Sequence, residues 1–203
     1  MQKIQITGPA FEPVTLEELK DHARVSHSRE DDKLATFMRA ARAACEQFCK
    51  TGFCSQQSKI QLDDVPETDT VKIPVNYVTA VTIQYLDTAG AQQDFDLINA
   101  YTYFTEGGDG VPARVSLKPS NAWPITQGYG GAFWLNVTHG KASPGAVHQD
   151  VRQAILSAAT YWFKNRSGHR KTDSPAKMVS TQQELQLPPE VQTTLQPHQL
   201  IWL

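Results

Sequence analysis

The stretch "DDKLATFMRAARAACEQFCKTGFCSQQSKIQLDDV", residues 31–65, contains the change of hydrophobic period that decides the fold. In its first half, apolar residues recur at spacings of three and four, which is typical of one buried helix face. From about residue 56 they recur at every second position, which is typical of a half-buried strand. The stretch therefore predicts a helix followed by a β-rich segment. The apolar positions of the helix are Leu34, Phe37, Met38, Ala41, Cys45 and Phe48.

A shorter helix is predicted just before this one. Thr15 stands three residues ahead of Glu18, and this spacing before an apolar run indicates a capping box at the start of a helix over about residues 16–25. Asp31 and Asp32 suit the positive N-terminal end of the second helix. We expect Gly52 to cap its C-terminal end.

Residues 56–140 predict a β-rich unit of five or six strands. Its candidate strands are short, rich in β-branched and aromatic residues, and separated by turn residues. They are "SKIQLDDV", "VKIPV", "YVTAVTIQYL", "DFDLI", "ARVSL" and "FWLNVTH".

The helical period returns in "VHQDVRQAILSAATYWFKNRSG", residues 147–168. A helix over residues 145–166 would be about 33 Å long. Residues 169–183 are polar and aperiodic and indicate a linker. The run "LPPEVQTTL", residues 187–195, predicts a last short helix with Pro189 in its first turn.

These elements predict an α+β fold in which a helical bundle carries a β-rich insertion and an extended C-terminal tail. We expect residues 1–55 to be the N-terminal helical part and 56–140 the insertion. Residues 141–168 would complete the bundle, and 169–203 would be a flexible arm ending in a docking tail. The expected bundle core contains Phe37, Phe48, Ile155 and Trp162.

The composition limits the possible functions. With 40% hydrophobic residues among 203, the chain should fold. Its formal charge of −2 argues against a protein whose main task is gripping nucleic acid, although a local basic face remains possible. The sequence has no signal peptide pattern and no apolar run long enough to span a bilayer. We expect a protein without membrane association, made in a cytoplasm.

The cysteines and histidines suggest a zinc site only weakly. Cys45, Cys49 and Cys54, with His22 or His27, would supply metal ligands, but their spacing is not a common structural zinc pattern. Cys45 also falls on the apolar helix stripe, where a buried free thiol is ordinary. We expect no metal site and no cofactor.

A nuclease is the remaining enzymatic alternative. Asp63 and Asp64, together with Asp94 and Asp96, would be the ligands of a magnesium cluster. All four fall at strand edges or turns, where solvated carboxylates are the default. The glycines lack a P-loop pattern, and the histidines form no metalloprotease or triad motif. We therefore expect no enzymatic activity.

Surface residues offer two kinds of contact. Cations on the helices are either solvated and paired locally or available for subunit contacts or a channel wall; they are Arg39, Arg42, Arg152, Lys164 and Arg166. The chain ends in an apolar group whose members either fold back onto the core or dock on a partner. We expect the docking residues to be Pro197, Leu200, Ile201, Trp202 and Leu203.

Three stretches together resemble the head-tail connector (adaptor) family of bacteriophages. They are "EPVTLEELKDHARV" with "DDKLATFMRAARAACEQFCKTGF", then "VTHGKASPGAVHQDVRQAILSAATYWFKNR" with its glycine at a strand end, and finally "LPPEVQTTLQPHQ". The family's closing motif ends in Tyr-Arg, and His198 and Gln199 stand there in this chain. The resemblance covers both ends of the chain, while the middle matches in character only.

The resemblance implies a structural protein of the virion, at the portal vertex of the capsid. It implies a homo-oligomeric ring, usually of twelve copies, that lies under the portal protein, extends the DNA channel and meets the next tail component. Genomic DNA would pass without sequence-specific binding. A head-closure or tail-completion protein is the alternative within the same class, and a packaging-associated metal-dependent nuclease is the other alternative.

Overall fold

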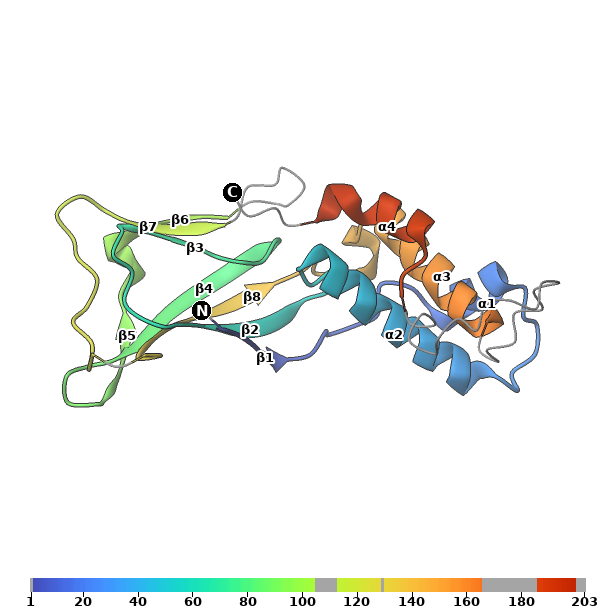
Figure 1. Ribbon diagram of the computed structural model, residues 1–203, viewed down its shortest axis with the longest axis horizontal. Coiled ribbons are helices and arrows are strands. Elements are labelled where there is room, and N and C mark those ends of the chain that lie inside the picture. The colour runs from blue at the N-terminus through green and yellow to red at the C-terminus, as the bar shows by residue number, and fades with distance from the viewer. Residues whose placement is uncertain (1, 105–112, 129, 166–185, 200–203) are drawn as a thin grey trace, which may run out of the picture. The chain divides into compact units, whose positions relative to one another are not determined.

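The computed structural model describes residues 2–104, 113–128, 130–165 and 186–199. These residues form two compact units (Figure 1). The helical unit contains residues 12–49 and the described part of 144–199. The β unit contains residues 2–11 and the described part of 50–143. The combination of helices with antiparallel sheets confirms the α+β class.

Four helices build the helical unit. They are α1 (Leu16–Ala23), α2 (Asp31–Cys49), α3 (Gln149–Lys164) and α4 (Pro189–Leu195), and a 3-10 turn, η4 (Gln196–His198), follows α4. The helices α1 and α4 each pack against both α2 and α3, which also contact each other. Segments from the two ends of the sequence thus share one bundle.

The capping box of α1 is confirmed. Thr15 Oγ1 accepts a hydrogen bond from the Glu18 N–H at 3.2 Å, and Glu18 Oε2 accepts one from the Thr15 N–H at 2.8 Å. The helix ends where Arg24 adopts the left-handed conformation, with φ of 58°. The predicted helix was therefore right in its start and two residues too long.

The expected end of α2 at Gly52 is wrong. The helix stops at Cys49, and Lys50 takes the left-handed conformation with φ of 57°. Gly52 is needed for another reason: a Cβ atom there would lie 1.6 Å from Gln56 Nε2. The glycine makes room for a buried side chain and does not cap the helix.

The long helix is shorter than predicted. It begins at Gln149 and ends at Lys164, which gives 16 residues in place of the expected 22. Pro144 and Gly145 lie instead in the 3-10 turn η2 (Pro144–Ala146), because proline and glycine disfavour a helix interior. Gly168, the last residue of the quoted run 147–168, lies outside the described residues.

The interior of the bundle contains Ile155 and Trp162, which are buried, whereas Phe37 and Phe48 are partly exposed. Phe37 meets Phe163 edge to face, with ring centroids 6.3 Å apart. The two phenylalanines thus lie at the margin of the bundle, and their assignment to the core is corrected. The spacing of apolar residues shows which side of a helix is apolar. It does not show how much of that side the neighbouring helices bury.

Two antiparallel sheets build the β unit. The five-stranded sheet has the order β1-β2-β8-β4-β5, and the three-stranded sheet has the order β3-β7-β6. The strands are β1 (Gln2–Thr7), β2 (Gln56–Leu62), β3 (Thr70–Lys72), β4 (Val78–Leu86), β5 (Gln92–Phe95), β6 (Ala100–Tyr103), β7 (Arg114–Leu117) and β8 (Phe133–His139).

The β unit differs from the sequence prediction in two missed strands, β1 and β6, and in one predicted strand that is divided. Residues 2–7 form β1, which pairs with β2, so the chain's start belongs to the β unit and not to an N-terminal helical part. β6 was also missed. The predicted strand 94–98 is divided, because Asp96 Oδ1 accepts a hydrogen bond from the Ile98 N–H and caps the 3-10 turn η1 (Leu97–Asn99).

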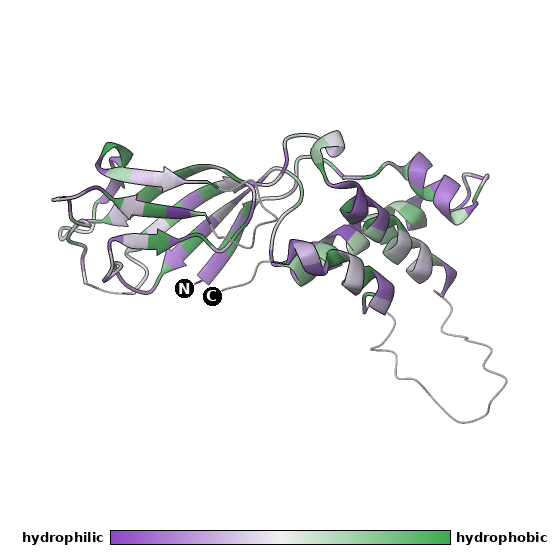
Figure 2. Ribbon diagram, turned by 90° about the horizontal axis from the view of Figure 1, so that it is seen from above, coloured by the Kyte–Doolittle hydropathy of each residue, from purple (hydrophilic) through white to green (hydrophobic). Residues whose placement is uncertain are grey.

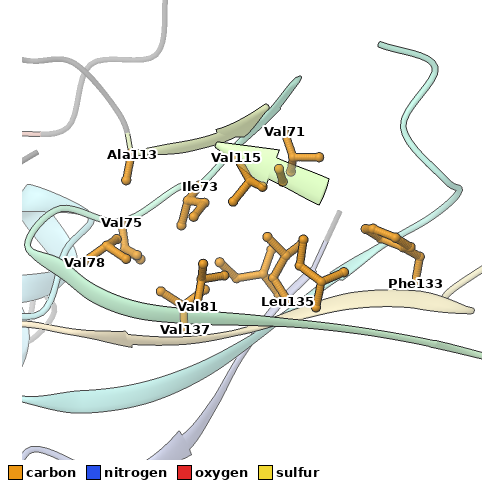
Figure 3. Close-up of a cluster of buried hydrophobic side chains, with 13 residues drawn as sticks. Val71, Ile73, Val75, Val78, Val81, Ala113, Val115, Phe133, Leu135 and Val137 are labelled. Atoms are coloured by element: carbon orange, nitrogen blue, oxygen red, sulfur yellow. The ribbon is translucent and has the colours of Figure 1, made fainter. Parts of the chain in front are cut away.

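The core of the β unit lies between its two sheets. Val71, Ile73 and Val115 face Leu135 and Val137 of the other sheet (Figure 3). Polar and apolar bands alternate along the strands (Figure 2), as expected where one face of each sheet is buried. The opposite face of each sheet is therefore available for contacts with other molecules.

Candidate interaction surfaces

The three cysteines are not arranged as a metal or nucleophile site. Cys45, Cys49 and Cys54 are buried and outside any disulfide, while His22 and His27 are exposed. Burial raises the pKa of the Cys45 and Cys49 thiols to about 12, with nearby negative charge adding to the effect. Among the described residues, no three His, Cys, Asp or Glu side chains are grouped as a metal site would require.

The aspartates of the nuclease alternative serve local structure. Asp64 Oδ1 accepts a hydrogen bond from the Val65 N–H at 2.7 Å. Asp94 Oδ1 accepts one from Gln84 Nε2 at 2.7 Å, and Asp96 caps η1. The structure does not bring these residues together with Asp63 as a metal cluster.

A buried histidine contacts a serine within the β unit. His139 is fully buried, and its Nε2 lies 3.0 Å from Ser58 Oγ. Burial, and secondarily the charge of Lys3, lowers the pKa of His139 to about 4. Its Nδ1 has no hydrogen-bond partner among the described residues, so the carboxylate that would orient a catalytic histidine is missing there. The pair joins β2 to β8 as a structural contact.

Two of the five helix cations are held inside the helical unit. Arg42 bridges Glu12 at 2.9 Å and Glu46 at 2.6 Å. Arg152 donates to the Pro13 carbonyl at 3.0 Å and to Glu18 at 2.5 Å.

Both guanidinium groups therefore fasten the chain before α1 to the bundle. Glu18 also accepts a hydrogen bond from the Thr15 N–H, and this, with Arg152 adding to it, holds the pKa of Glu18 below its ordinary value. Arg39 and Lys164 are exposed, and Arg166 lies outside the described residues.

The chain after α4 is fixed to the helical unit up to residue 199. His198 Nε2 lies 2.6 Å from Asp150 Oδ2 at the start of α3, and Gln199 Nε2 donates to the Phe48 carbonyl at 3.2 Å. Pro197 is exposed between these contacts and α4. The other expected docking residues, Leu200, Ile201, Trp202 and Leu203, lie outside the described residues.

The outer face of the five-stranded sheet is hollowed next to its edge. A groove of about 420 Å³ lies over β1, β2, β8 and β4, with Ile6, Ala80 and Thr138 among its lining residues. All six residues of β1 are exposed, including Ile4 and Ile6. One side of β1 pairs with β2, and its other side is an edge of the sheet. Such an edge, with apolar side chains, is a surface suited to protein contacts.

The edge of the three-stranded sheet carries a second exposed group. Ile98, Tyr101, Tyr103 and Phe104 are 69%, 47%, 45% and 40% exposed, and we call these four residues the aromatic edge. Neither this surface nor β1 was identified from the sequence. The runs "QKIQIT" and "AYTYF" alternate polar and apolar residues, as strands do. Each run is too short to predict a strand without further evidence.

One family model and three solved structures are similar to this chain. A family model described as "Head completion protein" matches residues 12–201. No curated protein sequence matches the chain. No helix in the described ranges is both long enough and apolar enough to span a bilayer.

Three solved structures resemble the chain over 100% of its length and 97% of theirs. A chain in "Neck of empty GTA particle computed with C6 symmetry" has 19% identity and a TM-score of 0.75. A chain in "Virion of native gene transfer agent (GTA) particle" has 20% identity and a TM-score of 0.75. A chain in "Neck of native GTA particle computed with C12 symmetry" has 18% identity and a TM-score of 0.71.

Proposed function

The chain belongs to the head completion protein family, and from this premise we propose that it is a structural subunit of the virion neck, where head and tail meet. The observation that carries the proposal is the family match over residues 12–201, because it includes nearly all of both units. The subunit joins the capsid to the tail as an adaptor and carries out no chemical step.

We propose further that the working form is a ring of twelve copies under the portal protein. Neck structures with this fold were computed with C6 and with C12 symmetry. A cyclic ring repeats one contact between two different surfaces of the subunit. The β unit offers a candidate for one of these surfaces, the edge strand β1 with its groove.

Arg39 and Lys164 are the proposed ring contacts on the helical unit, because they are exposed. Arg42 and Arg152 are weaker candidates, since both already pair within their own unit. Reversing charge in Arg39→Glu and Lys164→Glu together should reduce ring formation on heads, counted as copies per particle by mass measurement. Unchanged copy number would remove these two residues from the contact.

We propose that Pro197, which is exposed, and the tail of residues 200–203 dock on the portal protein. His198 and Gln199 belong to the helical unit, so a clean test deletes only residues 200–203. The truncated chain should stay folded by circular dichroism but fail to sediment with portal-bearing heads. Equal sedimentation of both forms would show that the tail is not the anchor, and insolubility would show that it belongs to the protein's own core.

The position within the neck separates the adaptor from the alternative, a head-closure or tail-completion protein. An adaptor binds heads that carry only the portal, whereas a closure protein needs the adaptor first. Adding the purified chain to heads before and after the other neck proteins, and imaging them by cryo-electron microscopy, distinguishes the two. As an adaptor it extends the DNA channel, meets the downstream tail protein, and lets the genome pass without sequence-specific binding.

A further inference from the structure

The outward side of the three-stranded sheet carries two tyrosines, each with a cation against its ring. Arg114 Cζ lies 4.8 Å from the centroid of Tyr103, and Lys118 Nζ lies 5.3 Å from that of Tyr101. The two rings are 6.4 Å apart. Val71 and Val115 face the core, so Arg114 and its neighbours in the alternation face outward.

Strand pairing extends this group across the whole sheet. Lys72, Arg114 and Tyr103 form one row across β3, β7 and β6, and Thr70, Ser116 and Tyr101 form the next. Thr70 Oγ1 and Ser116 Oγ are 2.8 Å apart. We call the face defined by Lys72, Tyr101, Tyr103, Arg114, Ser116 and Lys118 the cationic face.

The cationic face is positively charged, whereas the chain as a whole has a slight excess of acidic residues. The sequence has 21 acidic and 19 basic residues, yet "TVK", "AYTY" and "RVSL" contain no acidic residue. Asp96, which precedes β6, uses a carboxylate oxygen to cap η1. Residues 105–112, which connect β6 to β7, lie outside the described residues, so this count concerns the strands themselves.

We propose that the cationic face binds the phosphate backbone of double-stranded DNA, and this rests on the proposed function, in which the genome passes through the neck. A guanidinium and an ammonium group, with nearby hydroxyls, are the donors that phosphate oxygens take. The cations lie against the tyrosine rings, and this restrains them where phosphate would meet them. Complementarity of charge is what selects a polyanion for this surface.

The arrangement of the rings favours a duplex over single-stranded DNA. Proteins that bind single strands stack bases on free aromatic faces. Here each ring has a cation and the other tyrosine as neighbours, which leaves less ring face for a base. Arg114 is exposed and Lys118 is partly exposed, with its Nζ also donating to the Ile98 carbonyl at 2.6 Å. Such cations, with hydroxyls beside them, read a backbone and not a sequence.

The contact is weak for one copy, and a channel needs it to be weak. Few cations are involved, and backbone contacts of this kind weaken steeply with salt. Repetition around a ring would keep the DNA centred by many such contacts. DNA held in this way can still slide, because no base is recognised.

The test measures binding of the full-length chain to a fluorescein-labelled duplex of about 30 base pairs by fluorescence anisotropy, from about 20 to about 150 mM salt. The variant is Arg114→Gln with Lys118→Gln. The matched control is Arg29→Gln with Lys33→Gln. Both residues are exposed on the helical unit, so this variant loses the same two positive charges away from the cationic face. We expect the variant's slope of log affinity against log salt to be less negative by about 1.8, because each phosphate that a cation no longer neutralises changes the slope by about 0.9.

Three results would overturn the proposal. The first is absence of binding by the unaltered chain at the lowest salt. The second is an equal change of slope in the control, which would indicate a general effect of charge. The third is displacement of the duplex by poly-glutamate at equal charge as readily as by unlabelled duplex, which would assign the face to an acidic polypeptide.

A parallel assay separates this proposal from the proposed function. Heads are completed with the unaltered chain or with the Arg114→Gln, Lys118→Gln variant, and joined particles are counted by electron microscopy. Normal joining with reduced DNA affinity supports both proposals. Failed joining with unchanged DNA affinity would overturn the DNA contact and make the face a protein interface. Failure of even the unaltered chain to join heads to tails would contradict the proposed function alone.

Discussion

His198 and Asp150 are 48 positions apart in the sequence, and their Nε2 and Oδ2 atoms lie 2.6 Å apart. The His198 ring also lies beside that of His148, tilted by 43°, with the ring centroids 5.1 Å apart. This contact ties the last described turn of the chain to the N-terminal end of α3. It therefore defines where the helical unit ends and where the proposed docking tail begins.

Replacing Asp150 should weaken the helical unit at neutral pH but not in acid. Burial raises the pKa of Asp150, but the hydrogen bond with His198 and the other favourable contacts outweigh it, so the pKa lies below its ordinary value. The stabilisation is present above the unfolded pKa and is lost as pH falls through the folded pKa. Because the carboxylate is partly exposed, Asp150→Asn should cost only about 0.5–1 kcal/mol. Urea unfolding at pH 7 and pH 3 checks this, and a difference that persists in acid would contradict it.

The β unit should lose stability as the solution is made moderately acidic. The pKa of His139 is about 4, so between about 6.5 and 4 the unfolded chain binds a proton that the folded chain does not. Stability should fall over this window by at most about 3 kcal/mol, at 1.36 kcal/mol for each unit. In His139→Gln this part of the pH dependence should disappear from urea midpoints followed from pH 7 to pH 4.5. An unchanged slope in that variant would assign the pH dependence to other groups.

Trp162→Ala should destabilise the helical unit by about 3–5 kcal/mol, because the side chain is buried in the bundle. Its indole N–H also donates to the Gln186 carbonyl at 3.3 Å. Tyr161→Ala is the matched control, since Tyr161 is the next residue on the same helix and 40% exposed. It should cost less than about 0.5 kcal/mol. Similar losses in the two variants by thermal unfolding would show that Trp162 is not a core residue.

Gly140→Ala should destabilise the β unit by at least about 2 kcal/mol. Gly140 follows β8 with φ of 98°, and a Cβ atom there would lie 2.1 Å from the Cys54 carbonyl oxygen. Gly145→Ala is the control, because a Cβ at Gly145 meets nothing within 4 Å. The two melting temperatures provide the comparison. Equal tolerance of both changes would mean that the backbone at Gly140 can relax.

Removal of the thiols should leave folding independent of metal. All three cysteines are buried and outside any disulfide, so alanine is the suitable replacement at Cys45, Cys49 and Cys54. We expect the triple variant to fold with reduced stability, and EDTA to leave the melting temperature of the unaltered chain unchanged. A large drop on adding EDTA would revive the zinc hypothesis.

The sequence indicated the helices α1, α2, α3 and α4, most strands, and the α+β class, because spacing and capping are local properties of the chain. Thr15 and Glu18 are three residues apart, and their reciprocal hydrogen bonds need nothing beyond one helical turn. The glycine of the strand-end motif was noted only through the family resemblance, and the sequence did not show the Cys54 carbonyl that requires it.

The candidate surfaces depend on contacts that no local pattern contains. β1 becomes a strand only by pairing with β2, whose partner residues come 50 to 59 positions later, and Tyr103 meets Arg114 only through the pairing of β6 with β7. Phe37 and Phe48 lie on the predicted apolar stripe, yet the neighbouring helices leave them partly exposed. By itself, the sequence determined the positions of the helices and of most strands, since periodicity follows from backbone geometry. The tertiary structure alone decided which faces are covered, since burial depends on distant segments that pack against them.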